Sequence, residues 1–94
     1  ETGTLYGAEA KYLSAQLMYN AGEYAAAEKE ILNFIDQSTP HAYWLARSFI
    51  LLSDVYVAMD KKLDARQYLL SLQQNYHADD DIEHMIQERL EKLK

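Results

Sequence analysis

Apolar residues recur along the chain at intervals of three and four, the spacing that places them on one face of an α-helix. Five segments show this pattern, and all five predict helices. The first two are expected over residues 5–20 and 23–36. The expected core stripes are Leu13 and Leu17 with Ala10 and Ala21; Tyr24, Ala27, Ile31 and Phe34; Leu45, Phe49, Leu52, Tyr56 and Met59; Ala65, Leu69, Leu72 and Tyr76; and Ile82, Ile86, Leu90 and Leu93.

Glycine and proline mark where these helices end and begin. Gly22 separates the first two helices with almost no intervening chain, so it is expected to adopt a positive φ and to turn them antiparallel. The alanines at 25–27 are expected to let the two helices approach closely. Ser38 or Thr39 is a candidate N-cap for the third helix, with Pro40 at its first position.

The chain contains the same pattern twice, 38 residues apart. At this offset Ala27 aligns with Ala65, and Gly22 aligns with Asp60. Aspartate is among the few residues that tolerate left-handed backbone, so the second turn can have the geometry of the first. The other aligned pairs are Ala15 with Ser53, Gln16 with Asp54, Ile31 with Leu69, and Phe34 with Leu72.

The two units, "AEAKYLSAQLMYNAGEYAAAEKEILNF" and "FILLSDVYVAMDKKLDARQYLLSL", resemble tetratricopeptide (TPR) repeats. The period of 38 exceeds the usual ~34 residues, which places about one extra turn of chain in "STPHAYW". The resemblance implies an all-α, right-handed stack of two antiparallel helix hairpins plus a C-terminal capping helix. The repeats are expected over about 8–37 and 42–77, and the cap over about 80–94. The residue pattern of these units is most similar to that of long repeat proteins of the bacterial cell envelope. This resemblance favours the periplasm or envelope as the compartment.

In TPR proteins the first helix of each hairpin lines a concave groove that binds peptides. Carried over to this chain, the resemblance implies a partner-binding groove of Glu9, Tyr12, Gln16, Tyr19, Asn20, Arg47, Ile50, Asp54 and Val57. Mixed aromatic and polar residues on a concave face suit peptide recognition. The alternative is that these residues pack against neighbouring chain. Recognition of a C-terminal carboxylate is not expected, because Asp54 would repel it and no basic pair occupies the matching positions.

Composition narrows the classes of partner. Of the 94 residues, 49% are hydrophobic, and 15 acidic against 9 basic residues give a net charge of −6. A chain of this charge is repelled by nucleic acid and by anionic membranes, so neither is an expected partner. No apolar run approaches membrane-spanning length, so no direct membrane insertion is expected. The absence of cysteine excludes disulfides and thiolate metal sites.

No motif predicts catalysis or a cofactor. The chain has no nucleophile elbow, phosphate loop or HExxH motif, so we expect it not to be an enzyme. "HADDDIEH" offers His77, Asp79, Asp81 and His84 as metal ligands, but three aspartates ahead of an apolar stripe are better explained as capping a helix. A surface pair of Asp80 with His84 is also expected. We therefore expect no metal and no cofactor.

These observations predict a non-catalytic protein-interaction scaffold that binds a peptide or protein through its concave face. The alternative is a structural C-terminal cap of a longer repeat array, with no ligand of its own; an accessory helical domain of an enzyme is a third reading. The chain is expected to be a fragment of such an array. Its first helix would then expose apolar surface, expected at Leu5, Tyr6, Tyr12 and Tyr19, and would support a weak homodimer of the fragment.

Overall fold

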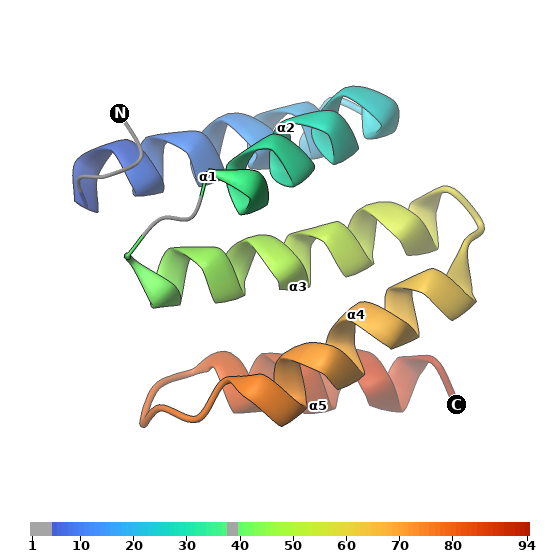
Figure 1. Cartoon of the computed structure of the whole chain (residues 1–94). Coiled ribbons are helices and arrows are strands. Elements are labelled where there is room, and N and C mark those ends of the chain that lie inside the picture. The colour runs from blue at the N-terminus through green and yellow to red at the C-terminus, as the bar shows by residue number, and fades with distance from the viewer. Residues whose placement is uncertain (1–4, 38–39) are drawn as a thin grey trace.

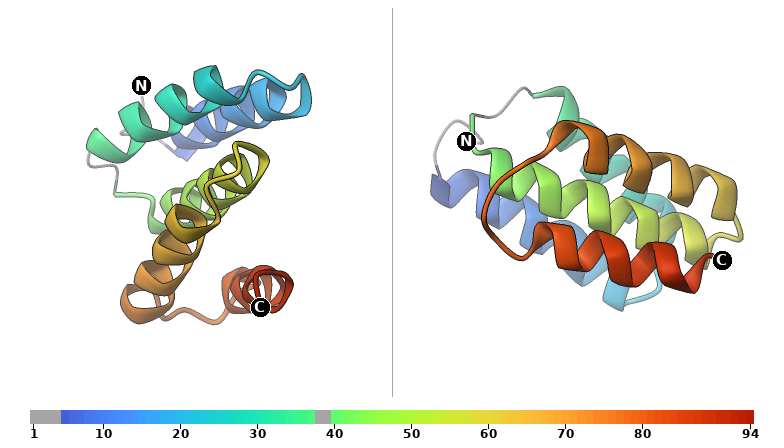
Figure 2. Two further views of the ribbon diagram at one scale, coloured as in Figure 1. Left: turned by 90° about the vertical axis from the view of Figure 1, so that its right-hand side faces the viewer. Right: turned by 90° about the horizontal axis from the view of Figure 1, so that it is seen from below.

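A computed structural model describes residues 5–37 and 40–94, and of residues 5 and 6 it describes only the backbone. This part of the chain forms helices without strands, as the sequence predicts. The helices are α1 (Leu5–Asn20), α2 (Tyr24–Asp36), α3 (Ala42–Ala58), α4 (Lys62–Asn75) and α5 (Ile82–Lys92). They lie in three layers: α1 beside α2, then α3 beside α4, then α5 alone (Figures 1 and 2).

The helices alternate in direction along the chain. In Figure 1, α1, α3 and α5 run one way, and α2 and α4 run back. Helix α3 lies at the centre and contacts each of the other four. It is accordingly buried on several sides, and its buried residues include Ala46, Ile50, Leu52 and Val55.

The turn at Gly22 is confirmed, and the second hairpin repeats it. Gly22 has φ +79°, and Asp60, 38 residues later, has φ +62°. In the first turn Gly22 N–H donates to the Tyr19 carbonyl and Glu23 N–H to that of Met18, at 3.0 and 2.9 Å. The corresponding bonds of the second turn run from the amides of residues 60 and 61 to the carbonyls of residues 57 and 56, at 3.1 and 2.7 Å. Both turns are therefore Schellman motifs, which need one residue in left-handed backbone.

The aligned core positions are also buried alike. Ala27 and Ala65 are both fully buried, and so are the apolar pair Ile31 and Leu69. The remaining buried pairs at this offset are Ala8 with Ala46, Tyr12 with Ile50, Ala15 with Ser53, and Phe34 with Leu72. Of the three alanines at 25–27, only Ala27 lies in the contact between helices, while Ala25 and Ala26 are exposed.

The expected core stripe of the first helix is wrong. Leu13 and Leu17 are 48% and 69% exposed, whereas Ala8, Tyr12 and Ala15 are buried. The alanines allow close approach, and the Tyr12 hydroxyl has hydrogen-bond partners in Gln16 and Arg47, so its burial leaves no polar atom unsatisfied. Tyr12 is therefore not part of an outward apolar patch. The side chains of residues 5 and 6, which completed that patch, lie outside the described part.

The third helix begins two residues later than expected. Ala42 N–H donates to the Pro40 carbonyl at 3.1 Å, so the chain is still turning at residue 41. The first helical bond runs from Leu45 N–H to the His41 carbonyl, and His41 takes the cap position. The candidate caps Ser38 and Thr39 lie outside the described residues. In the described helices no segment is long and apolar enough to cross a membrane.

Candidate functional site

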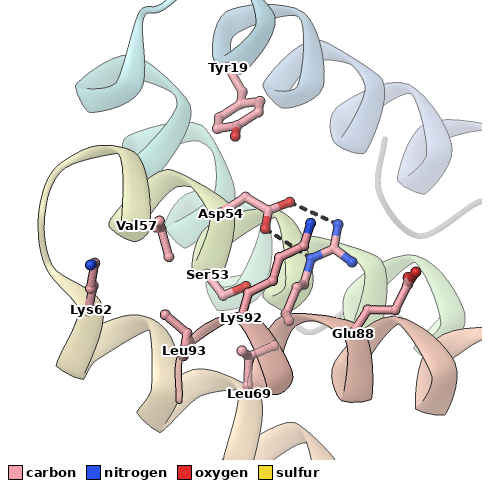
Figure 3. A pocket seen from close by; sticks show the side chains of 10 residues that line it. Tyr19, Ser53, Asp54, Val57, Lys62, Leu69, Glu88, Lys92 and Leu93 are labelled. Atoms are coloured by element: carbon pink, nitrogen blue, oxygen red, sulfur yellow. Dashed lines mark hydrogen bonds and ion pairs between the residues drawn. The ribbon is translucent and has the colours of Figure 1, made fainter.

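The described surface has a cleft of about 520 Å³ to which all three layers contribute. It lies near the C-terminal ends of α1, α3 and α5 and the start of α4 (Figure 3). Its lining combines apolar, aromatic and charged side chains: Tyr19, Ser53, Asp54, Val57, Lys62, Leu69, Glu88, Arg89, Lys92 and Leu93. Tyr19, Asp54 and Val57 come from the predicted groove, so the fold gathers three of those nine residues here.

An ion pair between two layers forms one wall of the cleft. Arg89 of α5 donates to both carboxylate oxygens of Asp54 on α3, from Nε at 2.9 Å and from Nη2 at 3.0 Å. Arg89 Nη1 also donates to the Met85 carbonyl at 3.3 Å. Two parallel bonds of this kind fix the geometry of both side chains. Arg89 therefore balances the negative charge of Asp54, which was expected to repel an approaching carboxylate.

Tyr19 covers the cleft from the α1 side. Its ring packs against that of Tyr24, with centroids 5.7 Å apart. Burial raises the pKa of the Tyr19 phenol, and the nearby charge of Asp54 raises it further. The phenol is therefore neutral near pH 7 and offers a hydroxyl that can donate or accept a hydrogen bond.

Charge in the cleft differs in sign from that of the whole chain. The lining includes Lys62, Arg89 and Lys92 together with Asp54 and Glu88, so it carries three positive and two negative groups. Glu88 also lies 3.6 Å from the Nε2 atom of His84. An acidic protein thus holds a locally basic cleft, which favours approach of an anionic or mixed-charge segment.

A second group of predicted residues forms a chain of hydrogen bonds away from the cleft. Arg47 Nη2 donates to the Tyr12 hydroxyl at 3.1 Å, which donates to Gln16 Oε1 at 3.0 Å. Gln16 Nε2 donates to Asn20 Oδ1 at 3.1 Å. Arg47 also donates from Nη1 to the Tyr43 hydroxyl at 2.9 Å. These bonds link the first two layers through polar side chains.

Arg47 is enclosed by aromatic rings. Its guanidinium carbon lies 5.1, 5.8 and 5.9 Å from the centroids of Tyr12, Tyr43 and Trp44. Burial lowers the pKa of Arg47, but the bonds to Tyr43 and Tyr12 outweigh that effect and raise it. Its Nε atom is buried without a hydrogen-bond partner in the described part of the chain. Arg47 therefore acts as an internal link between α1 and α3.

The remaining predicted groove residues divide by exposure. Tyr12 and Ile50, at 5% and 1% exposed, lie in the core and are not available to a partner, which corrects their expected place on an open face. Val57 is 40% exposed at the cleft. Asn20 is exposed and Glu9 is half-buried, and neither lines the cleft.

Sequence reasoning missed the contributions of α4 and α5 to the cleft. The predicted groove does not include Lys62, Arg89 or Lys92. The resemblance assigns the groove to the first helix of each hairpin, which omits α4, and it assigns only a capping role to the last helix. One signal was available in the sequence of the last helix. Arg89 lies in its middle, and the polar residues around it are mostly acidic or neutral. Pairing it with Asp54 required knowing that α5 packs against α3.

The "HADDDIEH" segment forms local contacts at the start of α5. Asp81 occupies the expected cap position of α5 but makes no side-chain capping bond. The Ile82 N–H donates instead to Asp80 Oδ1 at 3.0 Å. Tyr43 donates to Asp81 Oδ1 at 2.9 Å, and Tyr76 donates to Asp80. The expected pair of Asp80 with His84 is wrong, since His84 lies against Glu88 one turn further along α5. Among the described residues, no group of three or more potential ligands is arranged to hold a metal ion.

Comparison of the chain with protein-family models, with curated proteins and with solved structures gives no match.

Proposed function

We propose that this protein is a non-catalytic interaction scaffold that binds a short peptide segment of a partner protein in the cleft between α1, α3 and α5. The observation that carries the proposal is the meeting of Tyr19, Asp54 and Val57 in one cleft that α5 closes from the other side. Aromatic, apolar and charged groups in one concave site are the usual means of holding and orienting a peptide.

The lining suggests what such a segment contains. Val57, Leu69 and Leu93 offer apolar contact, while Lys62 and Lys92 offer positive charge. Neither lysine has an ion-pair partner within the described residues. A segment with an apolar side chain next to an acidic one would match both features. The ion pair of Asp54 with Arg89 holds the cleft wall in place before the segment binds.

We also propose that the architecture is a TPR-like stack. Two features support this assignment: the turn hydrogen bonds recur at an offset of 38 residues, and the buried alanines Ala27 and Ala65 take the same place in each hairpin. The alternation of helix direction in Figure 1 is consistent with a stack in which α1, α3 and α5 line one side. In this assignment the non-catalytic role follows from the family resemblance.

The proposal is tested by selecting peptides from a random library displayed on phage and measuring binding of the selected sequences by fluorescence polarisation. We expect enrichment of peptides with adjacent acidic and apolar residues. Val57→Glu, which places a charge in the cleft, should weaken binding at least tenfold. Leu63→Glu is the matched control, because Leu63 is 80% exposed on α4 and lies outside the cleft.

Circular dichroism and thermal melting of both variants separate loss of binding from loss of fold. Selection of no peptide, or equal binding by the Val57 and Leu63 variants, would argue against a binding cleft.

A structural cap is the second candidate function, and one observation favours it. The outward side of α5 is polar and exposed, at Glu83, His84, Gln87 and Glu91. Terminal units of repeat stacks need such a face to remain soluble. If the cleft binds no peptide, sealing the stack becomes the role that the observations favour.

A further inference from the structure

Helix α1 carries apolar side chains on the side that faces away from the rest of the molecule. Leu13 and Leu17 are 48% and 69% exposed, and the small residues Ala10 and Ala21, one turn to either side, are also exposed. These four positions form one line along the helix. We call Leu13 and Leu17 the outer face of α1.

The internal repeat shows what this position does elsewhere in the molecule. Leu51 and Val55 follow Leu13 and Leu17 by 38 residues, and they are 2% and 0% exposed. They belong to the core cluster that also contains Tyr12, Ala15, Ala27 and Ile31 of the first hairpin. In the second layer these two positions therefore form the contact with the layer before it.

We propose that the outer face of α1 is the docking face for a further helical hairpin of the same repeat, covalently joined to the chain and packed on α1 as α1–α2 packs on α3. The docking hairpin would present large apolar residues at the places of Tyr12 and Ile31, with a small residue at the place of Ala27. This inference is independent of what occupies the cleft.

A covalently joined hairpin fits this face better than a second copy of the chain. Stable dimers between separate molecules bury roughly 800 Å² on each partner, far more than two half-exposed leucines provide. A covalent link supplies a high effective concentration, so a small face is sufficient. A head-to-tail copy is also disfavoured, since it would set the leucines against the polar outward side of α5, which carries Glu83, Gln87 and Glu91.

The test extends the full chain by a second copy of residues 4–41, placed directly before Thr4. The added copy then carries the same surface that α1–α2 shows to α3. We expect one cooperative urea transition with a higher midpoint than that of the parent chain. Leu17→Glu at the original position should lower the midpoint of the extended chain and leave that of the parent almost unchanged.

The extended chain contains its own control. The same leucine-to-glutamate change in the added copy lies on the new outermost helix and should have almost no effect. Two separate transitions, or equal effects of the substitution in both copies, would overturn the proposal. A parent chain that forms a micromolar dimer abolished by Leu17→Glu would assign the face to a second copy and would also overturn it.

Discussion

The first hairpin, α1–α2, and the second, α3–α4, are built alike but are covered differently. They share the turn hydrogen bonds and the buried alanines at 27 and 65. They differ at the positions that point to the preceding layer. Those of the second hairpin, Leu51 and Val55, are buried, whereas those of the first, Leu13 and Leu17, are exposed.

This difference separates two uses of apolar residues within one repeat. One set closes the hairpin and is buried in both units. It is represented by Ala27 and Ile31 in the first hairpin and by Ala65 and Leu69 in the second. The other set connects layers and is buried only where a preceding layer exists. Each hairpin therefore presents two apolar faces, and burial of the second depends on a neighbour.

The largest expected effect compares the two layer-connecting positions directly. Leu51→Ala should destabilise the protein by about 2–5 kcal/mol, the range for removing a buried leucine side chain. Leu13→Ala, its counterpart in the first hairpin, should change the free energy of unfolding by no more than about 0.5 kcal/mol. Urea denaturation of both variants measures the difference. Equal costs would show that the two faces are not used differently.

The two turns can be compared by removing the glycine from the first and introducing one into the second. Gly22→Val should cost about 1 kcal/mol or more, because a β-branched residue resists a positive φ. No heavy atom lies within 4 Å of the Cβ that a side chain would add there, so the cost comes from backbone conformation rather than from a clash. Thermal melting and urea titration give the value, and stability equal to that of the parent would contradict the Schellman assignment.

Asp60→Gly is the matched change in the second turn. It removes the strain of a non-glycine residue at φ +62° and should stabilise the protein by about 0.5–1 kcal/mol. A loss of stability would mean that the Asp60 side chain makes a contact worth more than the strain.

Substitutions that break polar links between layers are expected to change the free energy of unfolding by less. The Asp54–Arg89 pair connects α3 with α5, and both side chains are about one quarter exposed. A double-mutant cycle with Asp54→Asn and Arg89→Met should give a coupling energy of about 1 kcal/mol, which decreases in high salt. A coupling near zero would make the pair incidental to the cleft wall.

The sequence was sufficient for the parts of the fold that local chemistry decides. The spacing of apolar residues located the five helices, and the alignment of Gly22 with Asp60 anticipated the two left-handed turns. It was not sufficient for the rotation of α1, because that helix has apolar or small residues on most of its circumference. Leu13 and Leu17 are four apart, as core residues are, and only packing shows that Tyr12 and Ala15 are buried in their place.

The cleft was predictable only in part for the same reason. Tyr19, Asp54 and Val57 lie on the helices that the family resemblance assigns to a groove. Arg89 and Lys92 approach them only through the packing of α5 on α3, which no local pattern encodes.

The smallest expected effect concerns the connection between α4 and α5. Burial, followed by the hydrogen bond to Asp80, raises the pKa of Tyr76 to about 12 from its ordinary value near 10. The neutral phenol is the form favoured by folding, so its contribution is complete below pH 10 and is lost as the pH rises to about 12. Tyr76→Phe should flatten this alkaline loss, as measured by urea midpoints across that range. An unchanged slope would assign the loss to other tyrosines.

The central claim, that the same repeat position is covered in α3 and open in α1, can be measured by thiol labelling. The chain contains no cysteine, so Leu17→Cys and Val55→Cys each introduce a single reactive group. Cys at 17 should react with a thiol reagent at close to the rate of a free peptide. Cys at 55 should react at least about 100-fold more slowly, since it becomes accessible only on unfolding. Similar rates at the two positions, or protection at 17, would contradict the account.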